Sequence, residues 1–335
     1  MKRTLYILQD GRLHRRDNSL YFESEKGRKF IPVENTNDIY ILGEVNVSKR
    51  FLEFTSQKQI CVHYFDKYGI YIGTYYPREY YNSGHIIVKQ VQHCIDDSKR
   101  IILAKCFASG NMRQNIRVLK YYSTRILEEK GEKLREIIIQ LEKDLVNIEN
   151  AKASQELEAI IQCSHERYYK AFNHIFCNPY FVRNKANEDV AYKCRNALIQ
   201  FGEAMCHTIV LSEIYKTYLD PRIGYLHTTD SHKFVLNLDV SYVFKAIMVD
   251  RLIFTLVNRK VITKDDFIQI NHEIILSKDG KKKFIKELDK RMATIVNHRH
   301  LGRSVSYRRL IRLELYKIQK HILEEDIYRP YQALW

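Results

Sequence analysis

Hydrophobic and polar residues alternate over the first 80 positions in the short runs that predict β-strands. Gly-containing turns at 10–11, 26–27 and 68–69 separate these runs. One amphipathic stretch, 47–58, instead predicts a helix with Ser48 as its N-cap. The strand-like runs are rich in β-branched and aromatic residues and lie at 5–8, 20–22, 30–33, 39–42, 60–65 and 70–73.

Beyond residue 80 the pattern changes to helical spacing. Apolar residues recur every three or four positions, as at Leu134, Ile138, Leu141 and Leu145, with Glu and Lys between them. The sequence therefore predicts an α+β protein. We expect a small N-terminal β-rich domain at 1–80 and a larger all-α domain at 81–335.

Composition places the chain among globular proteins. Its 335 residues are 45% hydrophobic and 28% charged, which is enough for two packed domains. No uncharged apolar run approaches the ~20 residues of a membrane span, and no signal peptide precedes the first strand-like run. The seven Cys residues are scattered without a CxxC pair. We therefore expect a cytoplasmic protein with reduced thiols and no membrane partner.

The net charge adds a hint about partners. The chain has 55 Lys and Arg against 40 Asp and Glu, a formal charge of +15. Such an excess favours a polyanion such as nucleic acid, although a basic enzyme fits it equally well. The late stretch 307–322 concentrates positive charge, either as a solvated helix face or as a surface that follows phosphates.

The candidate chemistry centres on one imidazole and one carboxylate. His227 ends a non-periodic stretch that contains Pro221 and Gly224, and Asp239 follows 12 positions later. A His and a carboxylate form a minimal site for a divalent metal. A hydrogen-bonded structural His and an N-capping Asp are the simpler alternatives on spacing alone.

Three segments around this pair resemble a known family. LDPRIGYLH, LNLD and FKAIMVDRLIFTLVNRKVI are similar to the CRISPR-associated "Cas-one" family of integrases and endonucleases. The resemblance continues at GRKFIPVENTNDIYILGEVNVSKRFLEFTSQKQICVHYF, at YIGTYYPREYYNSG and at YRRLIRLELYKIQKHI, and so covers the whole chain. It implies the same architecture, in which the helical domain is the catalytic one.

The resemblance also implies an activity and its partners. Members of this family bind Mg²⁺ or Mn²⁺ and act in spacer acquisition, a step of antiviral defence. A DNA 3′-hydroxyl attacks a phosphodiester of double-stranded or branched DNA, and the metal stabilises the charge that develops. The family works as a homodimer with a small ferredoxin-like partner, "Cas-two".

Matching the family pattern position by position gives an incomplete metal site. The family His falls on His227, and the first acidic residue of the next helix falls on Asp239. The metal-binding carboxylate three positions later falls on Tyr242, and the family Glu falls on Ile161. Neither Tyr at neutral pH nor Ile replaces a carboxylate on a hard cation.

Two readings follow from these substitutions. Glu158 and His165 lie on the same predicted helix face as Ile161 and are candidate surrogate ligands for a working enzyme. The simpler hypothesis keeps the fold and the DNA surface, with metal binding and catalysis impaired. Its limiting case is a non-catalytic structural subunit or paralogue within an integration complex. An unrelated basic DNA-binding module fits the motif order poorly.

Seven basic side chains are candidate DNA contacts. Each is expected to bind phosphate without reading sequence, and each has an ordinary alternative as a surface or ion-paired residue. They are Arg78, Arg222, Lys245, Arg251, Arg308, Arg309 and Arg312.

Overall fold

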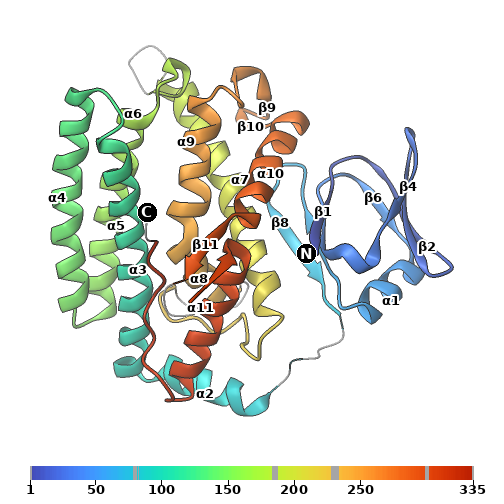
Figure 1. Ribbon diagram of the computed structural model, residues 1–335, viewed down its shortest axis with the longest axis horizontal. Coiled ribbons are helices and arrows are strands. Elements are labelled where there is room, and N and C mark those ends of the chain that lie inside the picture. Colours follow the sequence, from blue (N-terminus) through green and yellow to red (C-terminus); the bar gives the residue numbers. More distant parts are fainter. Residues whose placement is uncertain are drawn as a thin grey trace. The chain divides into compact units, whose positions relative to one another are not determined.

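The computed structural model describes residues 2–77, 81, 83–182, 188–227, 234–298 and 302–333 (Figure 1). The chain divides into two compact units, Met1–Asn82 and Ser83–Trp335. Strands dominate the first unit and helices the second, which confirms the predicted fold class.

The first unit contains two four-stranded sheets. One has the strand order β1-β5-β7-β8 and the other β4-β3-β2-β6. In the first sheet β1, β5 and β7 are parallel and β8 is antiparallel to β7. The strands are β1 (Arg3–Ile7), β2 (Gly11–Arg16), β3 (Ser19–Ser24), β4 (Gly27–Ile31), β5 (Thr36–Ile41), β6 (Val45–Val47), β7 (Cys61–Phe65) and β8 (Tyr71–Tyr75).

One short helix, α1 (Lys49–Gln57), completes the core of this unit. The Ser48 hydroxyl accepts a hydrogen bond from the Phe51 backbone N–H at 3.3 Å, so the predicted N-cap is confirmed. Phe51 and Phe54 from the helix are buried in one cluster with Leu13 and Ile39 from the two sheets. This cluster is the hydrophobic core that holds both sheets together.

The second unit is a helical assembly. Two short hairpins that were not predicted from the sequence accompany the helices. They are β9 (Phe267–Ile270) with β10 (Glu273–Leu276), and β11 (Ile295–His298) with β12 (Arg303–Ser306). The helices are α2 (Gly84–Ile95), α3 (Asp97–Ser123), α4 (Glu128–Asn150), α5 (Ser154–Lys170), α6 (Phe172–Ile175), α7 (Glu188–Ile214), α8 (Leu236–Lys245), α9 (Arg251–Asn258), α10 (Lys278–Ala293) and α11 (Tyr307–Ile322). In the described part of the chain, none of them has the length and apolar content that crossing a bilayer requires.

The centre of this unit is α8, which packs against α3 and α7. A π-helical turn, Ala246–Asp250, joins α8 to α9, and all five of its residues are buried. A π-turn shifts the helical register, so it changes which side chains share a face on either side of it. Here Lys245 precedes the turn, Asp250 is its last residue, and the two side chains face one another.

Candidate functional site

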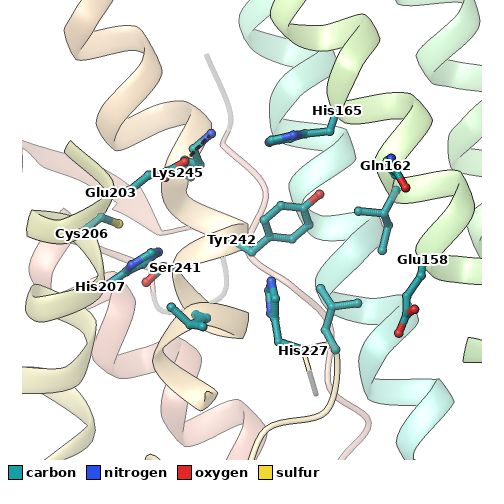
Figure 2. Close-up of a pocket in the computed structure, with 13 residues that line it drawn as sticks. Glu158, Gln162, His165, Glu203, Cys206, His207, His227, Ser241, Tyr242 and Lys245 are labelled. Carbon is teal, nitrogen blue, oxygen red and sulfur yellow. Dashed lines mark ion pairs between the residues drawn. The ribbon is translucent and has the colours of Figure 1, made fainter. Parts of the chain in front are cut away.

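A cavity of about 380 Å³ lies among α5, α7, α8 and the loop after α7 (Figure 2). Apolar side chains line much of it, with charged and imidazole groups between them. The lining residues are Glu158, Ile161, Gln162 and His165 from α5, Glu203, Cys206 and His207 from α7, Leu226 and His227 from the loop, and Leu238, Ser241, Tyr242 and Lys245 from α8.

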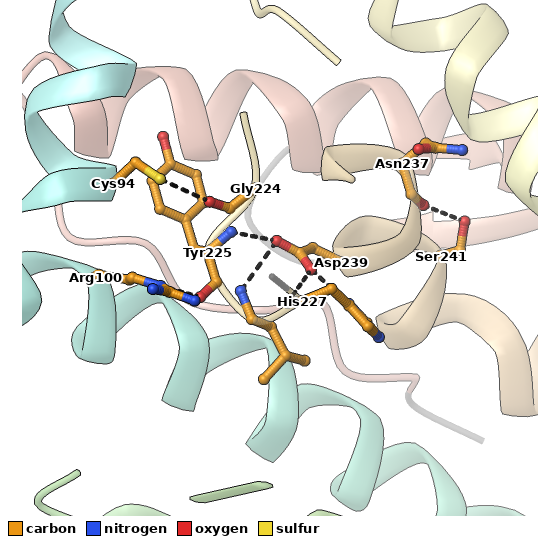
Figure 3. Close-up of polar contacts among 9 residues, drawn as sticks. Cys94, Arg100, Gly224, Tyr225, His227, Asn237, Asp239 and Ser241 are labelled. Atoms are coloured by element: carbon orange, nitrogen blue, oxygen red, sulfur yellow. Dashed lines mark hydrogen bonds and ion pairs between the residues drawn. The ribbon is translucent and has the colours of Figure 1, made fainter. Parts of the chain in front are cut away.

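The predicted pair of His227 and Asp239 is present. The His227 Nδ1 lies 2.7 Å from the Asp239 Oδ1 (Figure 3). The same carboxylate accepts the backbone N–H groups of Tyr225 at 2.6 Å, Leu226 at 3.2 Å and His227 at 3.0 Å. A carboxylate that receives four donors fixes both the loop and the imidazole, and leaves Nε2 of His227 for the cavity.

This arrangement changes the role expected for Asp239. The residue is fully buried, and it is not among the residues that line the cavity. It is also not the N-cap of α8, because Val235 holds that position. The geometry assigns Asp239 to orienting His227, while direct metal ligation would require it to give up protein hydrogen bonds.

Ile161 and Tyr242 both line the cavity, as the family register implied. Figure 2 shows the Tyr242 ring extending from α8 toward α5. Burial raises the pKa of the Tyr242 phenol to about 12, so it is a neutral hydroxyl at physiological pH. Neither side chain therefore brings an anionic oxygen to this space.

Lys245 forms an internal ion-pair cluster beside the cavity. Its ammonium lies 3.0 Å from Glu203 and 3.8 Å from Asp250, and it donates to the Tyr169 hydroxyl. Burial alone would lower the pKa of Lys245, but Asp250, Tyr169 and Glu203 raise it well above its usual value. Burial raises the pKa of Asp250 to about 6 against the attraction of Lys245. Lys245, which was predicted to contact DNA, is therefore already paired with two acidic residues of the protein.

The donor set does not fit Mg²⁺ or Mn²⁺. These cations prefer several oxygen ligands, with carboxylates prominent among them. Glu203 is paired with Lys245, and the positions implied for two carboxylates hold Ile161 and Tyr242. Among the described residues, no three His, Cys, Asp or Glu side chains are placed to hold one metal ion.

The predicted surrogates, Glu158 and His165, line the cavity without completing a ligand set. Burial lowers the pKa of His165 to about 4, with a further contribution from Lys245, and its ring packs edge-on against Tyr169 at 4.4 Å. Burial also lowers the pKa of His207 to about 4. Both imidazoles are neutral at physiological pH, so the charged groups of the lining include Glu158, Glu203 and Lys245.

These two imidazoles predict a loss of stability in acid. Their pKa in the folded chain lies below the usual value of about 6.5, so the unfolded chain binds protons that the folded chain excludes. This lowers the free energy of unfolding progressively as the pH falls from ~6.5 toward 4 and has no effect above pH ~6.5. At pH ~5 we expect them to lower the free energy of unfolding by roughly 4 kcal/mol together. The groups that face them are Glu203, Lys245 and His227.

Urea unfolding at several pH values measures this effect. The double variant His165→Gln and His207→Gln should lose less stability between pH ~7 and ~5 than the native chain does. His272→Gln, at an exposed position, serves as the control and should leave the pH dependence unchanged. Parallel pH profiles for the native chain and the double variant would contradict the prediction.

Two of the predicted DNA contacts form ion pairs between helices. Arg308 and Arg312 of α11 lie 3.0 Å and 2.5 Å from the carboxylate of Glu213, which is fully buried in α7. Only 14% and 25% of these two side chains is exposed. A buried carboxylate needs such partners, so both arginines join α11 to α7.

The other predicted contacts differ in how accessible they are. Arg222 pairs with Asp220, yet 71% of its side chain is exposed. Arg251 lies 4.5 Å from the centre of the Tyr121 ring, and both it and Arg309 are half-buried. Arg78 falls outside the described residues. Among the described members of this set, Arg222 has an exposed side chain, whereas Arg251, Arg308, Arg309 and Arg312 are half-buried and Lys245 is buried.

Glu203, His207 and Asp250 are not among the site residues predicted from the sequence. Glu203 and His207 are four positions apart on α7 and lie on one helix face, which is a signal that the sequence contained. The spacing of Asp250 in the sequence did not indicate a site, because its approach to Lys245 depends on the π-helical turn that ends at Asp250. Its partner could be identified only from the folded chain.

Comparison with known proteins supplies the family. The family model described as "CRISPR associated protein Cas1" matches residues 5–290. A "CRISPR-associated endonuclease Cas1 2" of Thermodesulfovibrio yellowstonii is 45% identical over 335 residues and covers 100% of both chains. The solved structure of a Cas1 protein from Thermotoga maritima has a TM-score of 0.82 at 37% identity, covering 98% of this chain and 100% of its own.

A more distant structure shows how far the fold extends. A chain of a "Cas6-RT-Cas1--Cas2 complex" has a TM-score of 0.81 at 14% identity. The match covers 100% of the present chain and 36% of that chain. The two proteins therefore share this fold, which in the complex is one part of a longer polypeptide.

Proposed function

The chain belongs to the Cas1 family, and from this premise we propose that it is a DNA-binding subunit of CRISPR adaptation with impaired metal-assisted strand transfer. Cas1 proteins are endonucleases and integrases of this pathway and are generally metal-dependent. The observation that carries the proposal is the cavity lined by Ile161 and Tyr242, with Glu203 committed to Lys245. The fold is retained where the ligand set is not.

The chemistry of the reaction explains why this loss matters. Attack of a 3′-hydroxyl on a phosphodiester adds negative charge to the phosphoryl oxygens, and a bound divalent cation would stabilise it. In this chain His227 is oriented by Asp239 and presents Nε2 to the cavity, where it can hydrogen-bond a phosphate or a strand end. The chain can therefore still bind DNA, while metal-assisted strand transfer is impaired.

The partners follow from the family and the charge. The formal charge of +15 and the exposed Arg222 support binding of double-stranded or branched DNA. A Cas1 chain occurs together with Cas2 in the complex matched above, which supports Cas2 as a partner of this chain. We include a second copy of the chain, as a homodimer, in the same proposal.

The limiting case is a subunit with no catalysis at all, serving beside an active paralogue. The absence of a carboxylate at positions 161 and 242 favours this case. A working enzyme with Glu158 and His165 as substitute ligands is the opposite case. Sensitivity of any residual strand transfer to His227→Ala separates the two.

We expect the purified chain to bind branched DNA while leaving Mn²⁺ free in solution. Its DNA affinity should fall steeply with salt, because Lys and Arg displace condensed counterions from the phosphates. Titration calorimetry with Mn²⁺ and a strand-transfer assay, with a Cas1 endonuclease run in parallel as positive control, measure the two properties. Stoichiometric Mn²⁺ binding with metal-dependent strand transfer abolished by His227→Ala would contradict the impairment. A salt-independent DNA affinity would contradict the DNA-binding role.

A further inference from the structure

A second feature lies in the first unit, on the outward face of the sheet with strand order β4-β3-β2-β6 (Figure 1). Successive residues of a β-strand point to opposite faces of the sheet, so every second residue shares a face. Leu13, Leu20, Phe22 and Ile31 point inward and belong to the buried core. Their neighbours along the strands form the opposite face, which we call the ring face: Arg12, His14, Arg16, Tyr21, Glu23, Arg28 and Phe30.

Three rings form a continuous row across this face. The sheet register places His14 opposite Tyr21 and Tyr21 opposite Phe30. The His14 and Tyr21 rings are stacked with centroids 5.9 Å apart, and the Tyr21 and Phe30 rings meet edge-on at 5.8 Å. Phe30 is 52% exposed, so the row ends in an aromatic ring that meets solvent. The exposed part of this ring is accessible to a ligand.

Arginines lie on both sides of the ring row. The next register row along the strands holds Arg12 and Arg28 with Glu23 between them, and Arg16 lies on the far side. The Arg28 guanidinium lies 3.9 Å from the centre of the Tyr21 ring, which fixes its position on the face. Three arginines therefore face solvent against a single carboxylate, and the ring face carries an excess of positive charge.

A hollow beside the ring row gives the face depth. It has a volume of about 480 Å³, and Arg12, His14 and Glu23 of the ring face form one side of it. Asn46, Val47 and Ser48 form the other side. Polar side chains thus border the rings, where they can hydrogen-bond the edge of a planar ligand.

We propose that the ring face binds single-stranded nucleic acid. A base stacks on the exposed Phe30 ring that ends the row, beside the Tyr21 ring that Arg28 covers, and the arginines on either side hold the phosphates. Rings combined with a basic border are the combination by which proteins hold single strands, since every base offers a π-face and every nucleotide a phosphate. This site goes beyond the proposed function, because it lies in the first unit and uses no residue of the cavity around His227.

The same features argue against the other occupants. In a duplex the faces of the bases are covered by their neighbours in the stack, so no base face is accessible to an aromatic side chain. An acidic protein surface would pair with the arginines but would not require the exposed Phe30 ring beside them. A single strand offers bases to the ring and phosphates to the arginines. Whether the strand is DNA or RNA depends on its sugar, which the test compares.

The test uses the full chain and fluorescein-labelled oligothymidylate, with oligouridylate as a second arm. Phe30→Ala should weaken binding by about tenfold, because the base loses the ring on which it stacks. Replacing Arg12 and Arg28 together by Ala should weaken binding and reduce the salt slope by about 1.4, at ~0.7 per phosphate contact on a single strand. Comparison of the two oligonucleotides assigns the natural ligand to DNA or to RNA.

Matched controls exclude general effects on the unit. Ile72→Ala removes an exposed apolar side chain from β8, and Lys49→Ala removes an exposed charge from α1. Both should bind oligothymidylate as the native chain does, and Phe30→Tyr should retain binding because it keeps a ring.

Three results would overturn the proposal. They are equal affinity in Phe30→Ala and the native chain, an equal loss in the control variants, and an equal loss for a blunt duplex and for the single strand. The proposed function is tested separately, since Mn²⁺ binding and strand transfer at the cavity do not involve Phe30.

Discussion

Replacing Ile161 and Tyr242 together by Glu is expected to give the chain stoichiometric Mn²⁺ binding and to raise strand transfer by at least about 100-fold. Both positions line the cavity that receives Nε2 of His227, one from α5 and the other from α8. Two carboxylates added there would supply the hard oxygen ligands that the native cavity does not offer. A metal ion contributes several kcal/mol to the transition state, and ~3 kcal/mol corresponds to about 100-fold in rate.

The controls for this gain come from the same cavity. Gln162→Glu adds one carboxylate to an adjacent lining position and should give neither metal binding nor activity. Adding His227→Ala to the double variant should abolish the gain, because it removes the oriented imidazole. Calorimetry with Mn²⁺ and a strand-transfer assay on branched DNA measure both effects. If the double variant binds Mn²⁺ no better than Gln162→Glu does, the assignment of positions 161 and 242 is incorrect.

Lys245→Met is expected to lower the free energy of unfolding by about 3–5 kcal/mol. The ammonium neutralises Asp250, which is buried, and also contacts Glu203 and Tyr169. Without it, Asp250 must either remain charged in a low-dielectric site or take up a proton, and both are unfavourable at neutral pH. Removing one partner of a buried pair therefore has a much larger effect than removing a surface charge.

Denaturant unfolding followed by circular dichroism checks this value. Lys133→Met breaks an exposed pair with Glu129 on α4 and should change the stability by less than about 1 kcal/mol. Combining Lys245→Met with Asp250→Asn should recover part of the loss, because the unpaired charge is removed. A loss for Lys245→Met no larger than that for Lys133→Met would show that the cluster does not stabilise the helical unit.

Local pattern predicted the main elements of the fold. Six strand-like runs and the helix with Ser48 as its N-cap all occur in the first unit, at closely similar positions. Strand β2, with the sequence GRLHRR, was missed because Leu13 is its one apolar residue and the rest face solvent or the ring face. The hairpin of β9 and β10 was also missed, although Asn271 and His272 form its turn with positive φ values of 49° and 69°.

The sequence by itself determined three things about this protein: two units of different class, membership in a family recognised from ordered motifs, and the substitution of two expected carboxylates by Ile161 and Tyr242. Each of these depends on residue identity and spacing along the chain, which folding does not alter. The tertiary structure decided which charges pair. It placed Asp239 behind His227, Lys245 against Asp250 and Glu213 between Arg308 and Arg312. Burial makes such pairs obligatory because an isolated charge in the interior is strongly unfavourable, and the partner a charge finds depends on packing between segments far apart in the sequence.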